Sequence, residues 1–239
     1  MRVEPSGVAE VELVGPDAPR FRQAVDSLAC EASRDALKPA LPYSVIVRNN
    51  GARPLALLGI RFDMRGAQGR SYSVIHYADT LRYPEKTNLA PGADRFVCAE
   101  PRYTDMVLRG EIGVDRRGPM NLKNLRAAMS IRASLDCAAF DDGRFAGPDS
   151  NGAFERFQRE REAEIALLEE VLEGMLKPEG AIEARLAQAV EIPAEQARDR
   201  ALNARRNLAK HFLEGLVQGG AEELAARVRN HRLRIRLWR

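Results

Sequence analysis

Hydrophobic positions follow two different periods along this 239-residue chain, and the period changes between residues 130 and 157. Before this stretch, short apolar runs alternate with polar residues and are separated by Gly, Pro and Asn, which is typical of β-strands. After it, apolar residues recur three and four positions apart almost to the end, which predicts amphipathic helices. The pattern therefore predicts an α+β protein, with a β-sandwich over residues 1–148 and a helical segment over residues 149–239.

The clearest strand signal lies between residues 43 and 64. Residues 43–48 (YSVIVR) and 54–64 (PLALLGIRFDM) flank residues 49–53, where an Asn-Gly pair tolerates the positive φ angles of tight turns. We expect the two runs to pair as an antiparallel hairpin, residues 43–48 against residues 55–62. The leading core candidates of this pair are Val45, Val47, Ile60 and Phe62.

Further alternating runs predict the other strands of the sandwich. They cover residues 8–14, 71–78, 94–99, 106–114 and 129–140. Asp141, Asp142 and Gly143 then predict a final hairpin turn. Residues 18–37 carry apolar side chains three and four apart, which favours a helical turn or two. About seven short strands separated by turns are typical of a sandwich.

Two groups of residues carry a resemblance to known proteins. The strand end at residues 48–51 (RNNG), the apolar strand near Pro54 and the LAPG segment at residues 89–92 resemble bacterial immunoglobulin-like sandwiches over residues 41–99. The whole chain also resembles uncharacterised bacterial secreted proteins in which such a sandwich ends in an LDxxxFxDGxFxGPDxxG stretch before helices. The matching residues are Leu135, Asp136, Phe140, Asp142, Gly143, Phe145, Gly147, Pro148, Asp149 and Gly152. The resemblance implies an antiparallel immunoglobulin-like sandwich and export, and it brings no established activity.

The first helix is expected to start just after residue 148. Asp149, Ser150 and Asn151 are good N-cap residues, because their side-chain oxygens accept backbone N–H groups of a first turn. The expected buried stripe is Phe154, Phe157, Leu168, Val171, Leu172 and Met175. The glutamates expected on the solvent side are Glu155, Glu160, Glu162, Glu164, Glu169 and Glu170. We expect a second helix over residues 181–190, and a third from Pro193 that Gly219 and Gly220 end.

Charge is distributed unevenly although the net charge is only +3. Residues 150–173 hold three basic and seven acidic residues, whereas residues 198–239 hold eleven basic and four acidic residues. The net charge therefore indicates no general affinity for nucleic acid or membranes, but the basic end is a candidate contact surface. Its candidate anion or partner contacts are Arg232, Arg234, Arg236 and Arg239.

The last residues alternate between arginine and apolar side chains, which is a period of two and predicts a strand. Leu233, Ile235 and Leu237 are expected to pack onto the protein, with the arginines facing water or the acidic helix. The alternative is a free basic arm, because chain termini are commonly disordered unless something ties them down.

Candidate chemistry is sparse. His76 stands without a nucleophile or an orienting group near it in the sequence, and Cys137 is expected to be a buried thiol. Asp141, Asp142, Asp149 and Asn151 could supply oxygen ligands to calcium. They do not follow the calcium-loop pattern, however, and a hairpin turn and a helix cap already explain them. The sequence therefore predicts no catalytic residue, no metal and no cofactor.

The sequence does not decide the cellular compartment of the protein. Cys30, Cys98 and Cys137 fit no zinc pattern and leave room for one disulfide. No apolar run is long enough to span a bilayer, and the protein is either cytoplasmic or, if a signal peptide was removed, periplasmic or extracellular. The preferred function is non-enzymatic contact with another protein. The alternative is binding to nucleic acid or an anionic surface through the basic end, and an enzyme ranks third.

Overall fold

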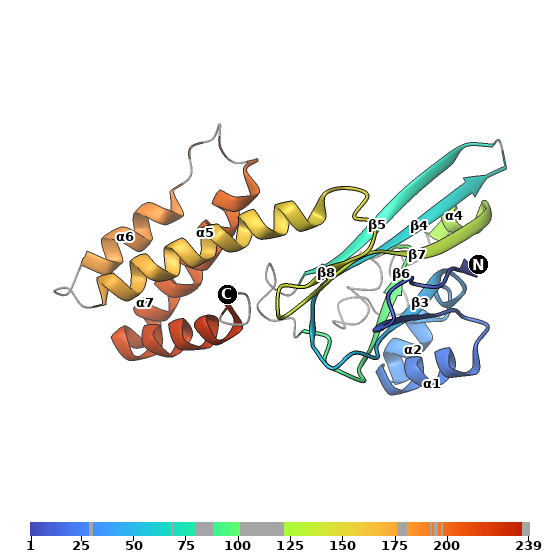
Figure 1. Cartoon of the computed structure of the whole chain (residues 1–239), viewed down its shortest axis with the longest axis horizontal. Helices are drawn as coiled ribbons and strands as arrows, with labels where there is room; N and C mark the ends of the chain where they lie inside the picture. Colours follow the sequence, from blue (N-terminus) through green and yellow to red (C-terminus); the bar gives the residue numbers. More distant parts are fainter. Residues whose placement is uncertain are drawn as a thin grey trace. The chain divides into compact units, whose positions relative to one another are not determined.

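The computed structural model describes residues 1–28, 31–67, 69–79, 88–100, 122–175, 181–191, 193, 196 and 198–235. The chain divides into two compact units, which we treat separately: the first unit, Met1–Ser150, and the helical unit, Asn151–Arg239. All the described strands lie in the first unit, and long helices make up the second (Figure 1). The α+β class expected from the sequence is confirmed.

Two β-sheets form the first unit. The larger has the order β1 (Arg2–Val3), β7 (Ala128–Phe140), β4 (Leu55–Gly66), β5 (Ser71–Asp79), with β8 (Phe145–Ala146) also paired to β7. The smaller has the order β2 (Val11–Val14), β3 (Ser44–Asn49), β6 (Asp94–Cys98). The β1–β7 pair is parallel and the other pairs are antiparallel, so the expected wholly antiparallel arrangement is wrong at β1. The immunoglobulin-like form of the sandwich is not confirmed.

Both sheets contribute to one hydrophobic core. The four expected core residues, Val45, Val47, Ile60 and Phe62, are each 0% exposed, and that prediction is confirmed. Both faces of β3 are buried, because α1 (Pro19–Leu28) packs against β3 and β6 on the face opposite the shared core (Figure 1). Phe21 of α1 meets Phe96 of β6 with the ring centroids 6.3 Å apart.

The expected hairpin between residues 43–48 and 55–62 is wrong, because β3 and β4 belong to different sheets. The side chain of Asn49 is buried and makes three hydrogen bonds: its Nδ2 donates to Arg53 O at 2.8 Å and to Leu89 O at 2.9 Å, and its Oδ1 accepts from Gly51 N at 2.9 Å. The N–H of Gly92 also donates to Asn49 O at 2.7 Å. These bonds direct the chain from one sheet to the other, and they join the two segments that carry the immunoglobulin-like resemblance.

The remaining expectations for the first unit meet mixed outcomes. The strands expected over residues 71–78, 94–99 and 129–140 are confirmed as β5, β6 and β7, and residues 18–37 form α1 and α2 (Glu31–Leu37). The strand expected over residues 8–14 is shorter, since β2 spans Val11–Val14. Residues 106–114 lie outside the described residues. The described part of the unit also contains two short helices, η1 (Leu41–Tyr43) and α4 (Leu122–Arg126).

The described part of the helical unit contains three helices: α5 (Ala153–Gly174), α6 (Ala181–Val190) and α7 (Arg200–Ile235). Helix α7 is broken by non-helical backbone at Gly219 and Gly220, as the sequence predicts, and we call residues 221–235 the C-terminal arm. Apolar side chains from all three helices and from the arm share one core: Leu167, Leu168, Val171, Leu186, Leu208, Phe212, Leu224 and Val228. None of the described helices has both the length and the apolar character needed to cross a membrane.

Two boundaries of α7 differ from expectation. The helix begins at Arg200 rather than at Pro193, because Asp199 caps it: its Oδ1 accepts from Ala201 N at 2.8 Å and from Leu202 N at 3.1 Å. The chain is helical through Ile235, so the expected strand is wrong over residues 232–235. The side chains of residues 233–235 and the whole of residues 236–239 lie outside the described residues, and the expected packing of the apolar side chains there stays a prediction.

Candidate functional site

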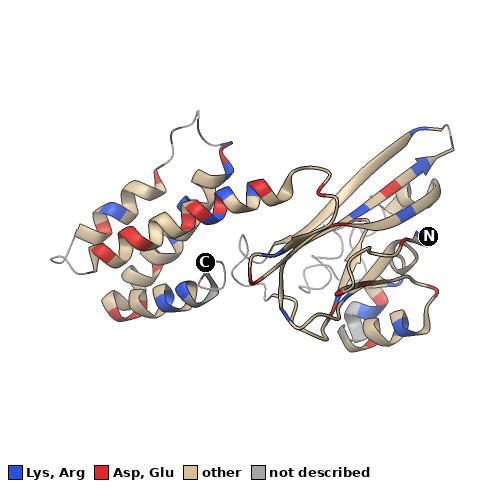
Figure 2. Cartoon of the chain, in the orientation of Figure 1, with Lys and Arg blue, Asp and Glu red and all other residues tan. Residues whose placement is uncertain are grey.

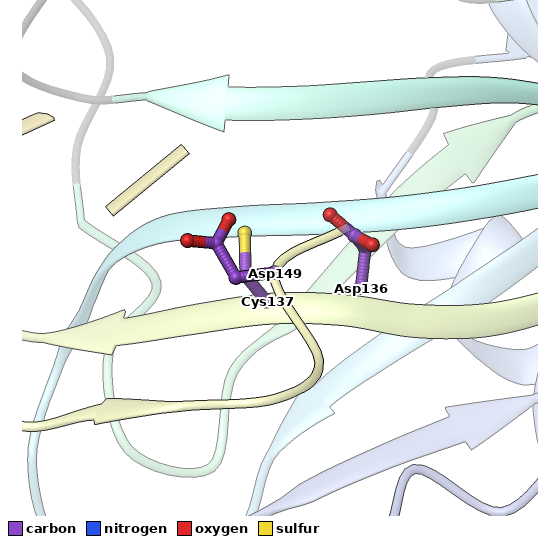
Figure 3. Close-up of side chains that lie close together, drawn as sticks. All are labelled: Asp136, Cys137 and Asp149. Carbon is purple, nitrogen blue, oxygen red and sulfur yellow. The ribbon is translucent and has the colours of Figure 1, made fainter. Parts of the chain in front are cut away.

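The side chains of the first unit that are best suited to bind a ligand or an ion lie together where β7 leads into the loop before α5. Gly59 and Ile60 of β4 face Cys137 and Leu135 of β7, so Asp136 is an extra residue in a β-bulge. As a result, Asp136 and Cys137 point the same way, and Asp149 of the loop lies beside them (Figure 3). One possible ligand atom from each of these three residues lies within 4.8 Å of the others.

The carboxylate of Asp136 already has partners on both oxygens. Its Oδ1 accepts hydrogen bonds from the N–H of Ser150 at 3.1 Å and from the Ser150 hydroxyl, and its Oδ2 accepts from the Tyr77 hydroxyl at 3.4 Å. The N–H of Asp149 donates to the backbone oxygen of Asp136 at 2.9 Å. Asp136 is buried, and it anchors the loop after β8 onto β7.

Gly147 allows this loop to lie directly on the strand. Its φ is +110°, and a Cβ at this position would stand 2.6 Å from the backbone oxygen of Asp136 and 2.9 Å from the Cα of Cys137. Any other residue would therefore combine backbone strain with a clash against backbone atoms. The glycine of the GPD segment thus has a structural explanation.

The same loop corrects the expected helix cap. The N-cap of α5 is Gly152, which makes no side-chain hydrogen bond to the first turn. Ser150 instead gives its hydroxyl to Asp136, and Asp149 adopts a left-handed φ of 49°. The sequence signal failed here because the competing partner of Ser150 lies on a strand 14 residues earlier.

As a metal centre, the group of Asp136, Cys137 and Asp149 is a poor match. A thiolate favours soft ions, whereas carboxylates favour hard ions such as calcium. An ion would also compete with Ser150 and Tyr77 for the Asp136 oxygens. The arrangement therefore favours a structural anchor over an ion site.

The residues of the calcium alternative do not gather. Asp142 lies at the β7–β8 turn, where its Oδ1 accepts from Arg144 N at 3.1 Å and a carboxylate oxygen lies 3.9 Å from Arg53. Asp141 is buried at the same turn, and this burial raises its pKa. Asp149 lies with Asp136 and Cys137 instead, and Asn151 is exposed.

A polar network covers the neighbouring part of the larger sheet. The Asp63 carboxylate accepts from Arg61 at 2.8 Å, from Arg132 at 3.0 Å and from the Ser73 hydroxyl. Burial opposes ionisation of Asp63, but these hydrogen bonds outweigh it and lower its pKa from 3.8 to about 2. Arg61 also donates to the Ser150 hydroxyl at 3.2 Å, which links this network to the anchored loop.

The isolated candidates have ordinary surroundings. His76 lies on β5 and is half-buried. Cys137 is buried, as expected. Cys98 is also buried, and this burial raises its pKa, which favours the protonated thiol. Cys30 lies outside the described residues.

The helical unit holds a buried ionisable cluster that the sequence did not reveal. Glu164 Oε2 lies 3.5 Å from Arg161 and 3.7 Å from His231 Nε2, and these side chains are only 7%, 5% and 9% exposed. Glu160 is buried as well, so the expected solvent-facing positions of Glu160 and Glu164 are wrong. The His231 ring meets Phe212 edge-on at 6.0 Å.

One signal could have revealed part of this cluster. His231 follows Leu224 and Val228 at helical spacing, so it continues the buried side of the arm.

The other predictions for the faces of α5 are confirmed only in part. As expected, the exposed glutamates include Glu155, Glu162 and Glu169, and the buried apolar residues include Phe157, Leu168 and Val171. Three residues of the expected buried stripe differ: Phe154 and Leu172 are half-buried, and Met175 is exposed.

The basic side of the arm is partly described. Arg229 and Arg232 are exposed and lie about one helical turn apart. Basic residues, drawn in blue, also occur toward the end of the described part of α7 (Figure 2). Arg227 is engaged internally, since it donates to Glu223 at 2.8 Å and to the backbone oxygen of His211 at 2.7 Å. Of the predicted contact residues, Arg232 is placed on the surface, the side chain of Arg234 is not described, and Arg236 and Arg239 lie outside the described residues.

No family model, curated protein or solved structure matches this chain.

Proposed function

We propose that this protein is a non-enzymatic binding protein that contacts an acidic partner protein through the arginines of its C-terminal arm. The supporting observation is the two-sided character of the arm. Leu224, Val228 and His231 face the helical core, while Arg229 and Arg232 are exposed. A helix held on one side and basic on the other presents its guanidinium groups from a fixed backbone.

The chemistry of arginine supports a protein partner. A guanidinium group forms paired hydrogen bonds with carboxylates and is less strongly hydrated than an ammonium group, so arginine is common in protein interfaces. In this proposal Arg234, Arg236 and Arg239 extend the contact surface beyond Arg232.

The first unit supplies the scaffold in this proposal. The polar residues that could bind a ligand there instead anchor the loop to β7. They are Asp136, Asp149 and Ser150. We further propose that the two sheets are an immunoglobulin-like sandwich, and that the protein acts in the periplasm or outside the cell. The supports are the turn residues at 48–51 and 89–92 and the motif of residues 135–152, and the scaffold role is an argument by analogy of fold.

Binding to nucleic acid is the second candidate, because the same exposed arginines would also attract phosphates. The two functions differ in their response to salt. Binding that replaces counterions along a nucleic acid weakens steeply as salt rises. A protein interface with packed apolar contacts is less sensitive.

Site-specific photo-crosslinking tests the proposal. A photoreactive amino acid at Asn230, between the two exposed arginines, should trap a discrete protein in cells of the source organism. Asn207, exposed on the first part of α7, is the matched control position. The Arg229→Glu, Arg232→Glu double variant should lose the adduct at Asn230 and keep its fold, because both side chains are exposed.

Three results would contradict the proposal. They are the absence of any adduct at Asn230, equal adducts from Asn230 and Asn207, or an adduct that survives charge reversal. Retention of the purified protein on DNA, with a steep salt dependence that the double variant abolishes, would instead support the second candidate.

A further inference from the structure

The helical unit contains a cavity of about 480 Å³ that is distinct from the C-terminal arm. Its described lining comes from the second half of α5, from α6, from the first turns of α7, and from Glu191, Pro193 and Gln196 between the two last helices. Most of its lining is polar. The polar lining residues are Glu170, Arg185, Gln188, Glu191, Gln196 and Arg205.

One ion pair forms part of the cavity wall. Arg205 of α7 donates to Glu170 of α5 at 2.6 Å, and the two side chains are 25% and 45% exposed. A carboxylate that holds the guanidinium in this way fixes its orientation before a ligand arrives. The pair also connects α5 to α7, so the wall is part of the packed helical unit.

The lining carries both signs of charge in equal number. Arg185 and Arg205 are cationic, Glu170 and Glu191 are anionic, and the two glutamines offer both donors and acceptors. A purely anionic ligand would face two carboxylates, and a purely cationic ligand would face two guanidinium groups. A ligand with one carboxylate and one ammonium group can satisfy both signs.

We propose that this cavity binds a small zwitterion, either a free amino acid or a short peptide with free ends. Its volume lies within the range of about 300–1,000 Å³ that is usual for small-molecule sites. In this proposal Arg185 pairs with the ligand carboxylate, Glu191 accepts the ligand ammonium group, and the Glu170–Arg205 pair forms the fixed wall. The inference is independent of the proposed function of the arm.

Isothermal titration calorimetry and amide NMR of the intact chain test this site. The probes are a panel of free amino acids, and dipeptides and tripeptides with free ends, together with the same peptides N-acetylated and C-amidated. We expect a member of the unblocked panel to bind and to shift amide signals around Arg185 and Arg205. Binding of the free amino acids or of the unblocked peptides shows which of the two is the ligand.

Two variants sharpen the test. Arg185→Gln should weaken binding by about tenfold, the effect of losing one charged hydrogen-bond partner. Arg159→Gln, an equivalent change on the exposed first half of α5, should leave binding unchanged. The inference is overturned if no unblocked ligand binds at millimolar concentration, if blocked peptides bind as well as free ones, or if Arg185→Gln has no effect. None of these results bears on the crosslinking test of the arm.

Discussion

Glu164 gives the sharpest test of the helical unit, because one carboxylate oxygen faces both Arg161 and His231 inside the protein. Glu164→Gln keeps the shape of the side chain and removes its charge. Arg161 then remains buried at 5% exposure without the opposite charge 3.5 Å away. Removing one member of a buried ion pair costs about 3–5 kcal/mol, and the long separation here favours the lower end, about 3 kcal/mol.

The assay is unfolding by urea and, in parallel, by heat, both followed by far-ultraviolet circular dichroism at constant pH. For a unit of this size, a loss of about 3 kcal/mol corresponds to a fall in melting temperature of roughly 12 °C or more. Glu162→Gln is the matched control, since Glu162 is exposed on the same helix and its change should cost less than about 0.5 kcal/mol. Equal stability of the two variants would refute the buried charge cluster.

A double replacement tests the physical reason. Well-packed apolar residues can replace a buried ion pair at little cost, because the desolvation of both charges is then avoided. The Arg161→Met, Glu164→Leu double variant should therefore be more stable than Glu164→Gln alone. A double variant that is less stable than the single one would show that the loss comes from packing rather than from removal of the Glu164 charge.

Three further predictions concern the first unit and use the same unfolding assay. Gly147→Ala should destabilise the protein by about 3 kcal/mol or more, because the new Cβ would stand 2.6 Å from a backbone oxygen. Gly92→Ala should cost less, because Gly92 has a positive φ but open space around it. Asp136→Asn should cost about 1–3 kcal/mol because it weakens the anchor of the loop, while zinc or calcium should leave the melting temperature of the parent protein unchanged. The pKa of Asp63 falls from 3.8 to about 2 on folding, so its stabilising contribution is complete above about pH 4 and is lost as the pH drops toward 2. Asp63→Asn should flatten the pH dependence of stability in that window.

Contrary results would be equally informative. Equal costs for the two glycine variants would show that the loop does not lie on β7. A clear rise in melting temperature with zinc or calcium, lost in Asp136→Asn, would turn the anchor into a metal site. An unchanged pH profile for Asp63→Asn would mean that the arginines do not hold its pKa low.

The sequence predicted the elements of this fold better than their pairing. Alternation identified the long strand β7 and the buried side chains of Val45 and Phe62, because burial on a strand follows directly from a period of two. The hairpin failed because Asn49 bonds to Leu89, a partner 40 residues away that no local pattern reveals. Local turn chemistry therefore identified a change of direction but not the strand to which it leads.

Non-local partners also explain the errors at the candidate sites. Ser150 does not cap α5 because Asp136 accepts its hydroxyl hydrogen bond. Glu164 does not face water because it lies beside His231, which belongs to the arm. The final residues form a helix rather than a strand through Ile235, and there the arm already places Val228 and His231 on its buried side.

Hydrogen exchange in the C-terminal arm is the most direct test of the central claim, that a docked helix presents exposed arginines. Amides of residues 224–231 should be protected to nearly the same degree as those around Phe212, because both segments share the helical core. The Arg229→Glu, Arg232→Glu variant should keep this protection. Exchange of the arm at the rate of an unstructured chain, beside a protected first part of α7, would show a free basic tail and contradict the proposed binding surface.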